Sequence, residues 1–413
     1  MTNLMMLFDI AVIVLAAKLA GVVVRKLGQP AVVGEIAVGV LFGALLQSNQ
    51  VTRVVLSGDV RTALNAVATV GIVLFMFTVG HEWDHRVLRG NGRSAAGIAV
   101  GATLLPFLLG GGTAIWLAAS QYHPANPVVF VLFVGTAMSI TALPVLARIV
   151  IDRGLSTTPV GRMAVASAAA VDVAAWVVLA VVVSLASGVS SWHMVLLVPF
   201  VLVLVFVARP LLSRALSRWT GNGGFGLLFV GLCLCAAATE WFGTHVVFGA
   251  FLFGAILPGR DNPVVRRHVD EVDRFTRGIL LPVFFVIAAI NVDLSALGTA
   301  GILELLLILG VAVAGKVLGA YLGARTFGME RGPARAIAVL MNARGVTELV
   351  VLQVGLQIGV LDTRLYSIMV MMALFTTALT GPLLTLLQRR HGPIGRLTSA
   401  PLEVEVPAAA HVG

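Results

Sequence analysis

Long apolar runs separated by short polar segments occupy almost the whole of the 413-residue chain. Most runs have about the 20 residues that cross a 30 Å hydrocarbon core as an α-helix. Strict alternation of apolar and polar residues is absent, which argues against a membrane β-barrel. A mean hydropathy of +1.00 with 11% charged residues excludes an ordinary soluble domain. We predict an all-α polytopic membrane protein with thirteen spans, at 5–24, 31–47, 62–80, 95–119, 128–149, 160–187, 192–212, 224–242, 244–258, 278–296, 300–324, 333–358 and 365–388.

Arginine and lysine mark alternate connections between these spans. Seven segments hold 22 of the 28 basic residues: 25–26, 86–93, 148–162, 209–218, 260–277, 325–335 and 389–396. The connections on the other side hold only Arg53, Arg61 and Arg364. Because cytoplasmic loops are enriched in positive charge, we expect the N-terminus outside and the C-terminus in the cytoplasm of a bacterial inner membrane. The same bias accounts for the net charge of +9 without a nucleic-acid partner.

One acidic residue lies inside a predicted span with no other charge in its run. Asp172 interrupts SAAAVDVAAWVVLAVVV, which otherwise holds only apolar and small residues. An ionised carboxylate in hydrocarbon is costly unless it is paired or protonated, so acids at this depth mark ion or proton pathways by default. The alternative is a structural acid that pairs with Lys316 or Arg344 and fixes helix packing.

Two predicted spans carry signals for a broken helix. The fifth span holds a polar run followed by a proline, which removes a backbone donor: Ser139, Thr141 and Pro144. The twelfth span holds polar residues and a glycine near its middle: Asn342, Arg344, Gly345 and Glu348. Irregular backbone at membrane depth is tolerated only where it lines a cavity or is buried in protein. Broken helices in these positions predict inverted repeats that cross near the bilayer midplane.

Five longer motifs follow one another along the chain. They are TALPVLARIVIDRGLSTTPVGRMAVASAAAVDVAAW, HVVFGAFLFGAILP, LPVFFVIAAINVDL, GKVLGAYLGARTFGMERGPARAIAVLMNARGVTELVVLQVGLQIGVL and MVMMALFTTALTGPLL. In their order and spacing the chain resembles the monovalent cation:proton antiporter-2 family, which includes bacterial and plant cation/proton exchangers, Kef-type transporters and sodium/proton antiporters. The resemblance implies a sodium/proton-antiporter-like fold with inverted repeats. Its two crossed, partly unwound helices would be those that hold Thr141 and Arg344.

The resemblance also implies a division of the chain. One membrane transporter domain would occupy 1–388, followed by a short cytoplasmic tail at 389–413. Dimerisation helices would lie at roughly 1–60 and 190–260, and the mobile core at roughly 62–187 and 278–388, in a homodimer within the lipid bilayer. We expect the charged segment 260–277 to be an amphipathic cytoplasmic linker or a solvated loop.

The chain departs from the family pattern at one position of the expected site. Relatives carry two adjacent acids, and alignment on the following VAAW places Asp172 on the second and leaves Val171 at the first. Lys316 resembles the buried lysine that pairs with the missing acid in relatives. Because a buried unpaired ammonium is costly, Lys316 needs another partner or must be neutral.

Together with the resemblance, Asp172 implies a secondary antiporter that exchanges protons for Na⁺ or K⁺ by alternating access. A proton and a cation would compete for this one carboxylate, while Ser139, Thr141 and unwound carbonyls supply neutral oxygens. One acid instead of two favours one-for-one electroneutral exchange, although Lys316 could serve as a second proton carrier. Among the other polar residues, Arg344 and Glu348 would pair along one helix face, and Asn342 and Pro144 would support the crossing helices.

Two other functions fit the same residues. A proton-coupled exporter of an organic or ionophoric substrate would use the larger and less charged site that Val171 leaves. A transport-inactive sensor or partner-binding homologue would keep the fold without exchange. No phosphate-binding loop or nucleotide fingerprint is present, so we expect no nucleotide, no cofactor and no enzymatic activity. HEWDH at 81–85 lacks ligands paired across elements, so we expect no resident metal.

Overall fold

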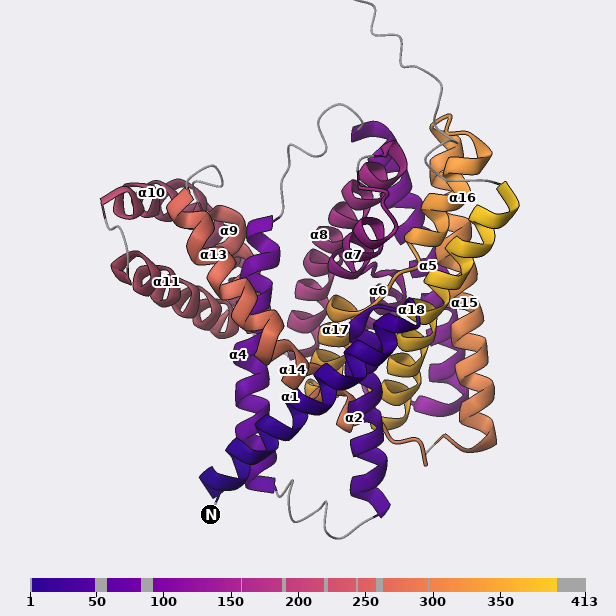
Figure 1. Cartoon of the computed structure of the whole chain (residues 1–413), viewed down its shortest axis with the longest axis horizontal. Coiled ribbons are helices and arrows are strands. Elements are labelled where there is room, and N and C mark those ends of the chain that lie inside the picture. Colours follow the sequence, from indigo (N-terminus) through magenta and orange to yellow (C-terminus); the bar gives the residue numbers. More distant parts are fainter. Residues whose placement is uncertain are drawn as a thin grey trace, which may run out of the picture.

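The computed structural model describes residues 2–48, 58–82, 92–156, 158–187, 191–218, 222–242, 244–257, 263–295 and 297–391. Regular structure in these ranges is entirely helical, as predicted (Figure 1). The elements, with η for a short π-helical turn, are α1 (Thr2–Lys26), α2 (Ala31–Ser48), α4 (Gly58–Glu82), α5 (Gly92–Leu117), η2 (Ala118–Tyr122), α6 (Pro127–Ser139), α7 (Leu143–Asp152), α8 (Pro159–Ser187), α9 (Ser191–Val203), η3 (Leu204–Ala208), α10 (Arg209–Arg218), α11 (Asn222–Trp241), α12 (Val246–Ile256), α13 (Pro263–Phe275), η4 (Thr276–Leu280), α14 (Leu281–Ile290), α15 (Gly298–Thr326), α16 (Arg331–Leu340), α17 (Val346–Gln357) and α18 (Thr363–His391).

The described helices have the lengths and compositions of membrane spans. Nine helical segments are long and apolar enough to cross a bilayer, and α2, α12 and α17 hold shorter apolar stretches. All of them fall on predicted spans, so the prediction of a polytopic all-α membrane protein is confirmed. The number of thirteen spans and the orientation of the termini stay predictions. Arg53 and the tail beyond residue 391 lie outside the described residues.

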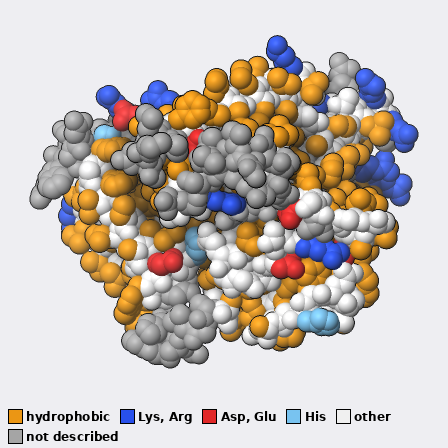
Figure 2. Space-filling model, turned by 90° about the horizontal axis from the view of Figure 1, so that it is seen from below, with side chains coloured by type: hydrophobic (Ala, Val, Ile, Leu, Met, Phe, Trp, Pro, Cys, Tyr) orange, Lys and Arg blue, Asp and Glu red, His pale blue; other side chains and the backbone are white. Residues whose placement is uncertain are grey.

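Apolar side chains cover much of the outer surface. Leu303, Leu318 and Leu322 on α15 are each more than half exposed, and so are Leu104 and Leu108 on α5. Figure 2 shows hydrophobic side chains spread over one face of the molecule. Lipid tails are as apolar as leucine, so a bilayer accommodates these exposed side chains at little cost.

The helices pack as two bundles. The first, which we call the scaffold bundle, consists of α1, α2, α4, α11, α12, α13 and α14. The second, the core bundle, consists of α5, α6, α7, α8, α15, α16, α17 and α18. α4 and α14 fall in sequence ranges expected for the core. In the structure, however, α4 packs against α12, and α14 packs against α2. Both helices predicted to be broken, α6–α7 and α16–α17, belong to the core bundle together with the Asp172 helix α8.

Glycines bring α5 and α15 into backbone contact. The backbone of Gly97 and Gly101 on α5 lies against Gly319 and Gly323 on α15, with three residues between the two glycines of each stripe. A Cβ atom on Gly101, Gly319 or Gly323 would collide with a backbone carbonyl of the opposite helix. Small residues at this spacing allow membrane helices to approach more closely than larger side chains would. The side chains next to the stripe can therefore reach main-chain atoms of the partner helix.

The charged segment 260–277 contains the helix α13, which leads through η4 into α14. Its polar face carries the ion pairs Arg267–Glu271 at 3.0 Å and Arg277–Asp273 at 2.6 Å. Val265 and Val269 on the opposite face are buried. The described part of this segment is thus an amphipathic helix packed on the scaffold bundle rather than a solvated loop.

Candidate functional site

The two broken helices meet at their interruptions, as predicted. The first break separates α6 from α7 at residues 140–142, and Pro144 is the second residue of α7. The second break separates α16 from α17 at residues 341–345. The Ala142 amide donates to the Ala343 carbonyl at 3.0 Å, and the Thr141 hydroxyl donates to the Met341 carbonyl at 3.1 Å. The two chains of the crossing are therefore joined directly through their unwound segments.

Arg344 binds the C-terminal end of α6. Its guanidinium donates to the Ala137 carbonyl at 3.1 Å and to the Met138 carbonyl at 2.6 Å. The last carbonyls of a helix lack partners within that helix and carry the negative end of its dipole. Arg344 also forms the expected pair with Glu348, at 2.7 Å, and both side chains are fully buried. One arginine thus satisfies the end of one half-helix and neutralises an acid in the first turn of another.

Lys316 reaches the same helix end from α15. Its ammonium donates to the Ser139 carbonyl and, at 2.9 Å, to the Ala102 carbonyl on α5. The side chain is fully buried, and none of the described carboxylates lies within ion-pair distance of it. Val171 is also fully buried. The partners that Lys316 requires in place of the missing acid are therefore main-chain carbonyls.

Asp172 lies on the other side of the same break, at the N-terminal end of α7. Its carboxylate is on α8, 2% exposed, and its Oδ2 accepts a hydrogen bond at 3.2 Å from the Leu143 amide. Leu143 begins α7, so the carboxylate satisfies one of the free amides at the positive end of that half-helix. Oδ1 is buried and has no hydrogen-bond partner within the described ranges. Lys316 is near enough to interact electrostatically with the carboxylate.

Two other predicted residues, Ser139 and Asn342, donate hydrogen bonds to main-chain carbonyls. The Ser139 hydroxyl donates to the Thr136 carbonyl at 2.8 Å, within its own helix. The Asn342 amide donates to the Thr376 carbonyl on α18 at 3.3 Å. α17 has no side-chain cap, so Asn342 ties the break to α18 instead of capping the following helix. Sequence reasoning missed Thr377, whose hydroxyl donates to the Arg344 carbonyl at 2.7 Å. Its only signal was the threonine pair in the FTTALTG part of a family motif.

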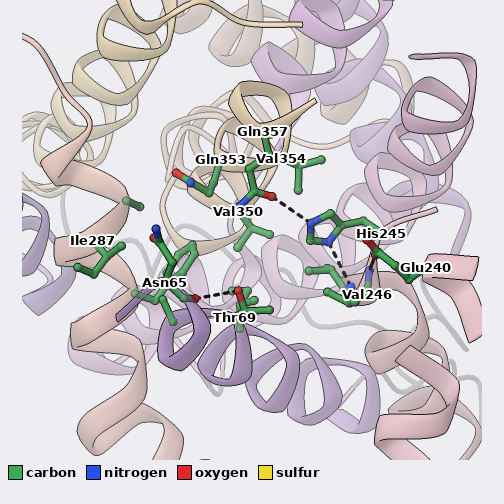
Figure 3. A pocket seen from close by; sticks show the side chains of 15 residues that line it. Asn65, Thr69, Glu240, His245, Val246, Ile287, Val350, Gln353, Val354 and Gln357 are labelled. Atoms are coloured by element: carbon green, nitrogen blue, oxygen red, sulfur yellow. Dashed lines mark hydrogen bonds between the residues drawn. The ribbon is translucent and has the colours of Figure 1, made fainter. Parts of the chain in front are cut away.

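A polar cavity lies between the two bundles. It has a volume of about 250 Å³ and is bounded by α4, α11, α12 and α14 of the scaffold bundle and α17 of the core bundle. Asn65, Glu240, His245, Gln353 and Gln357 contribute its polar lining (Figure 3). The His245 imidazole lies 3.4 Å from the Gln357 side-chain oxygen, which joins the two bundles across the cavity.

An aromatic contact connects the cavity wall to the Asp172 helix. Trp176 is four residues after Asp172 on α8, and its ring meets that of Phe248 edge to face at a centroid distance of 5.9 Å. Phe248 follows Val247, which lines the cavity. Asp172 itself is not part of the cavity lining. The aromatic pair therefore joins the Asp172 helix α8 to α12, whose first residues line the cavity.

Metal ligands do not gather elsewhere in the part of the chain that the structure describes. No group of three histidine, cysteine or acidic side chains occurs there at metal-binding distance. Asp84 and His85 of the HEWDH segment lie outside the described residues.

Comparison with solved structures agrees with the observed architecture. The sodium/proton antiporter MjNhaP1 from Methanocaldococcus jannaschii, in a structure at pH 8, superposes with a TM-score of 0.62 over 96% of this chain and 99% of its own. A second structure of the same antiporter gives a TM-score of 0.67. Sequence identity is 18% in both comparisons, so this likeness concerns the fold. The expected sodium/proton-antiporter-like fold is confirmed.

Sequence comparison extends over nearly the whole chain. The chain is 32% identical to Na(+)/H(+) antiporter NhaS4 of Synechocystis over 397 residues, which cover 92% of this chain and 97% of that relative. It is 35% identical to Cation/H(+) antiporter 17 of Arabidopsis thaliana and spans about half the length of that plant relative. Residues 11–389 match the family model for the transmembrane sodium/hydrogen exchanger. The chain therefore belongs to the sodium/hydrogen exchanger family.

Proposed function

We propose that this protein is a secondary antiporter that exchanges protons for a monovalent cation, Na⁺ or K⁺, at Asp172. The observation that supports this most directly is the carboxylate's asymmetry. One oxygen is held by the Leu143 amide, and the other is buried without a partner at the crossing of two broken helices. A buried carboxylate oxygen gains stability from either a proton or a cation. Both therefore compete for one place on the protein.

The surrounding charges keep cation binding reversible. Lys316 interacts electrostatically with Asp172, and the N-terminal end of α7 adds a partial positive charge. Both favour an ionised carboxylate when the proton leaves, and both oppose a cation that binds there. A transported ion must bind strongly enough to enter and weakly enough to leave. The Thr141 hydroxyl oxygen, whose hydrogen is donated to Met341, still has a lone pair to offer as a neutral ligand.

Alternating access would come from movement of the core bundle against the scaffold bundle. The Asp172 helix and both crossings belong to the core bundle, and the polar cavity lies at the boundary with the scaffold bundle. Its carboxylate, imidazole and amide groups could line the cation's approach from one side of the membrane. We therefore extend the proposed dimerisation domain to include α4 and α14. A homodimer with an external N-terminus completes the proposal.

The test is cation-induced proton movement in proteoliposomes with a pH-sensitive dye inside and Na⁺, K⁺ or Li⁺ added in turn. We expect a cation-dependent pH change in the wild type that Asp172→Asn abolishes. Asparagine can still accept the Leu143 hydrogen bond, so this variant should fold. Asp270→Asn on the exposed face of α13 is the matched control and should retain exchange. Exchange by Asp172→Asn, or no wild-type response to any of the three cations, would contradict the proposal.

A further inference from the structure

A second inter-bundle groove lies at the C-terminal end of α18. It has a volume of about 550 Å³ and runs between the α1–α2 turn of the scaffold bundle and α7 and α18 of the core bundle. The residues that define it chemically are Leu27, Gln29, Arg153, Thr385, Leu386 and Arg389. By the positive-charge distribution, this end of the molecule is predicted to face the cytoplasm.

The polar part of the groove is suited to an anion. Arg153 is held in place by hydrogen bonds to the Thr385 hydroxyl at 2.8 Å and the Gly381 carbonyl at 3.1 Å. Arg389, one turn beyond Thr385, is exposed. No carboxylate is present among the described residues that line the groove. Two guanidinium groups without an acid between them can donate hydrogen bonds to the oxygens of a phosphate group.

The groove also has an acceptor without a donor. The Gln29 amide nitrogen donates to the Ala378 carbonyl at 3.0 Å, which fixes the orientation of the side chain. Its oxygen, Oε1, is buried and has no hydrogen-bond partner in the described structure. A buried unpaired acceptor costs free energy that a hydroxyl donor would recover. The groove thus combines donors for a phosphate with an acceptor for a hydroxyl.

Exposed leucines flank these polar groups. Leu27 is 74% exposed and Leu386 is 49% exposed. Arg25 and Lys26 end α1 beside the groove, and Arg390 follows Arg389. Basic residues next to apolar side chains at the cytoplasmic boundary are the usual recognition pattern for anionic phospholipids, because the head group and an acyl chain are bound together. A free anion would leave the leucines exposed.

We propose that this groove binds an anionic phospholipid of the phosphatidylglycerol class. The phosphate lies between Arg153 and Arg389, a head-group hydroxyl donates to Gln29, and an acyl chain covers Leu27 and Leu386. Because the lipid contacts both bundles, it ties the α1–α2 turn to α18 and restrains their relative movement. The effect on transport rests on the proposed antiport, whereas lipid binding itself does not.

The test compares Arg389→Gln with Arg390→Gln, since both remove one exposed charge from the same helix end and only Arg389 lines the groove. Binding is measured on the whole purified protein by native mass spectrometry and by the rise in melting temperature with added phosphatidylglycerol. Phosphatidylcholine and free glycerol 3-phosphate serve as probes for a neutral lipid and a soluble anion. We expect phosphatidylglycerol to bind about five-fold more weakly to Arg389→Gln than to Arg390→Gln. Neither of the other two probes should stabilise the wild type.

Three results would overturn the proposal: equal binding by the two variants, equal stabilisation by phosphatidylcholine, or equal stabilisation by glycerol 3-phosphate. Melting without lipid checks that Arg389→Gln is folded. Asp172→Asn should bind phosphatidylglycerol like the wild type. A failure of the proposed antiport is therefore distinguishable from a failure of the lipid site.

Discussion

The contact between α5 and α15 makes Gly319→Ala a sharp test of how Lys316 is held. A methyl carbon at this position would approach the Gly101 carbonyl about 1 Å closer than the roughly 3.3 Å of a nonbonded carbon–oxygen contact. The obstructing atom is backbone, so the helices must separate. Lys316 is three residues away, and its bond to the Ala102 carbonyl at 2.9 Å would lengthen beyond hydrogen-bond range.

Two costs contribute to the expected destabilisation. Overpacking of a tight interface costs about 1–3 kcal/mol. Loss of one hydrogen bond from a charged donor adds about 1.5–3 kcal/mol, although hydrogen bonds within membranes average nearer 0.6 kcal/mol. We expect a total of about 2–6 kcal/mol. A change of this size should lower the melting temperature in detergent by several degrees or more.

Gly310→Ala on the same helix is the matched control. Its added methyl meets no atom within 4 Å, so the substitution should be neutral or slightly stabilising through helix propensity. Thermal unfolding followed by intrinsic fluorescence compares the two variants in the same detergent. If Gly319→Ala and Gly310→Ala have the same melting temperature, then α5 and α15 are not in backbone contact as described. The explanation of how Lys316 is held by the Ala102 carbonyl would then also be wrong.

Two further predictions concern the crossing itself. Arg344→Lys keeps the charge, but a lysine cannot bind the Ala137 and Met138 carbonyls and Glu348 at the same time. We therefore expect a lower melting temperature in detergent. An unchanged melting temperature would show that the guanidinium group is dispensable. If a proton and a cation compete for Asp172, lowering the pH on the cation side should raise the apparent KM for the cation while saturating cation restores the maximal rate. Proteoliposome transport measured over a range of pH decides this, and a lower maximal rate at constant KM would contradict competition.

Much of the fold was predictable because membrane helices have strong sequence signals. Length and hydropathy located the spans, and Pro144 and Gly345 located the two interruptions. The grouping of α4 and α14 with the scaffold bundle was not predictable from these signals. Every apolar span looks alike in composition, so hydropathy does not report which helix is its neighbour. The α13 helix was also ambiguous, since its charge pattern suits a solvated loop equally well.

The charged residues of the site were predictable because each is costly in lipid. Their hydrogen-bond partners were less predictable where those partners are main-chain groups. Asp172, Lys316, Arg344 and Glu348 stood out because a charge at membrane depth needs compensation. The compensation for Lys316 comes from carbonyl groups, among them that of Ala102. Every residue has a carbonyl, so a main-chain acceptor leaves no mark in the sequence. The glycine spacing in GKVLGAYLG was the indirect signal, because it allows the helices to approach closely.

The buried charges at the crossing also determine how membrane voltage would act on the moving bundle. The described charged side chains there are two cations, Lys316 and Arg344, and two carboxylates, Asp172 and Glu348. With all four ionised, the sum is zero, and adding either a proton or a monovalent cation to Asp172 gives the same single positive charge. If both loaded forms cross the field in opposite directions, their electrical work cancels over a cycle. Because backbone dipoles rather than a second acid hold Lys316, this balance needs no ionisable group at position 171.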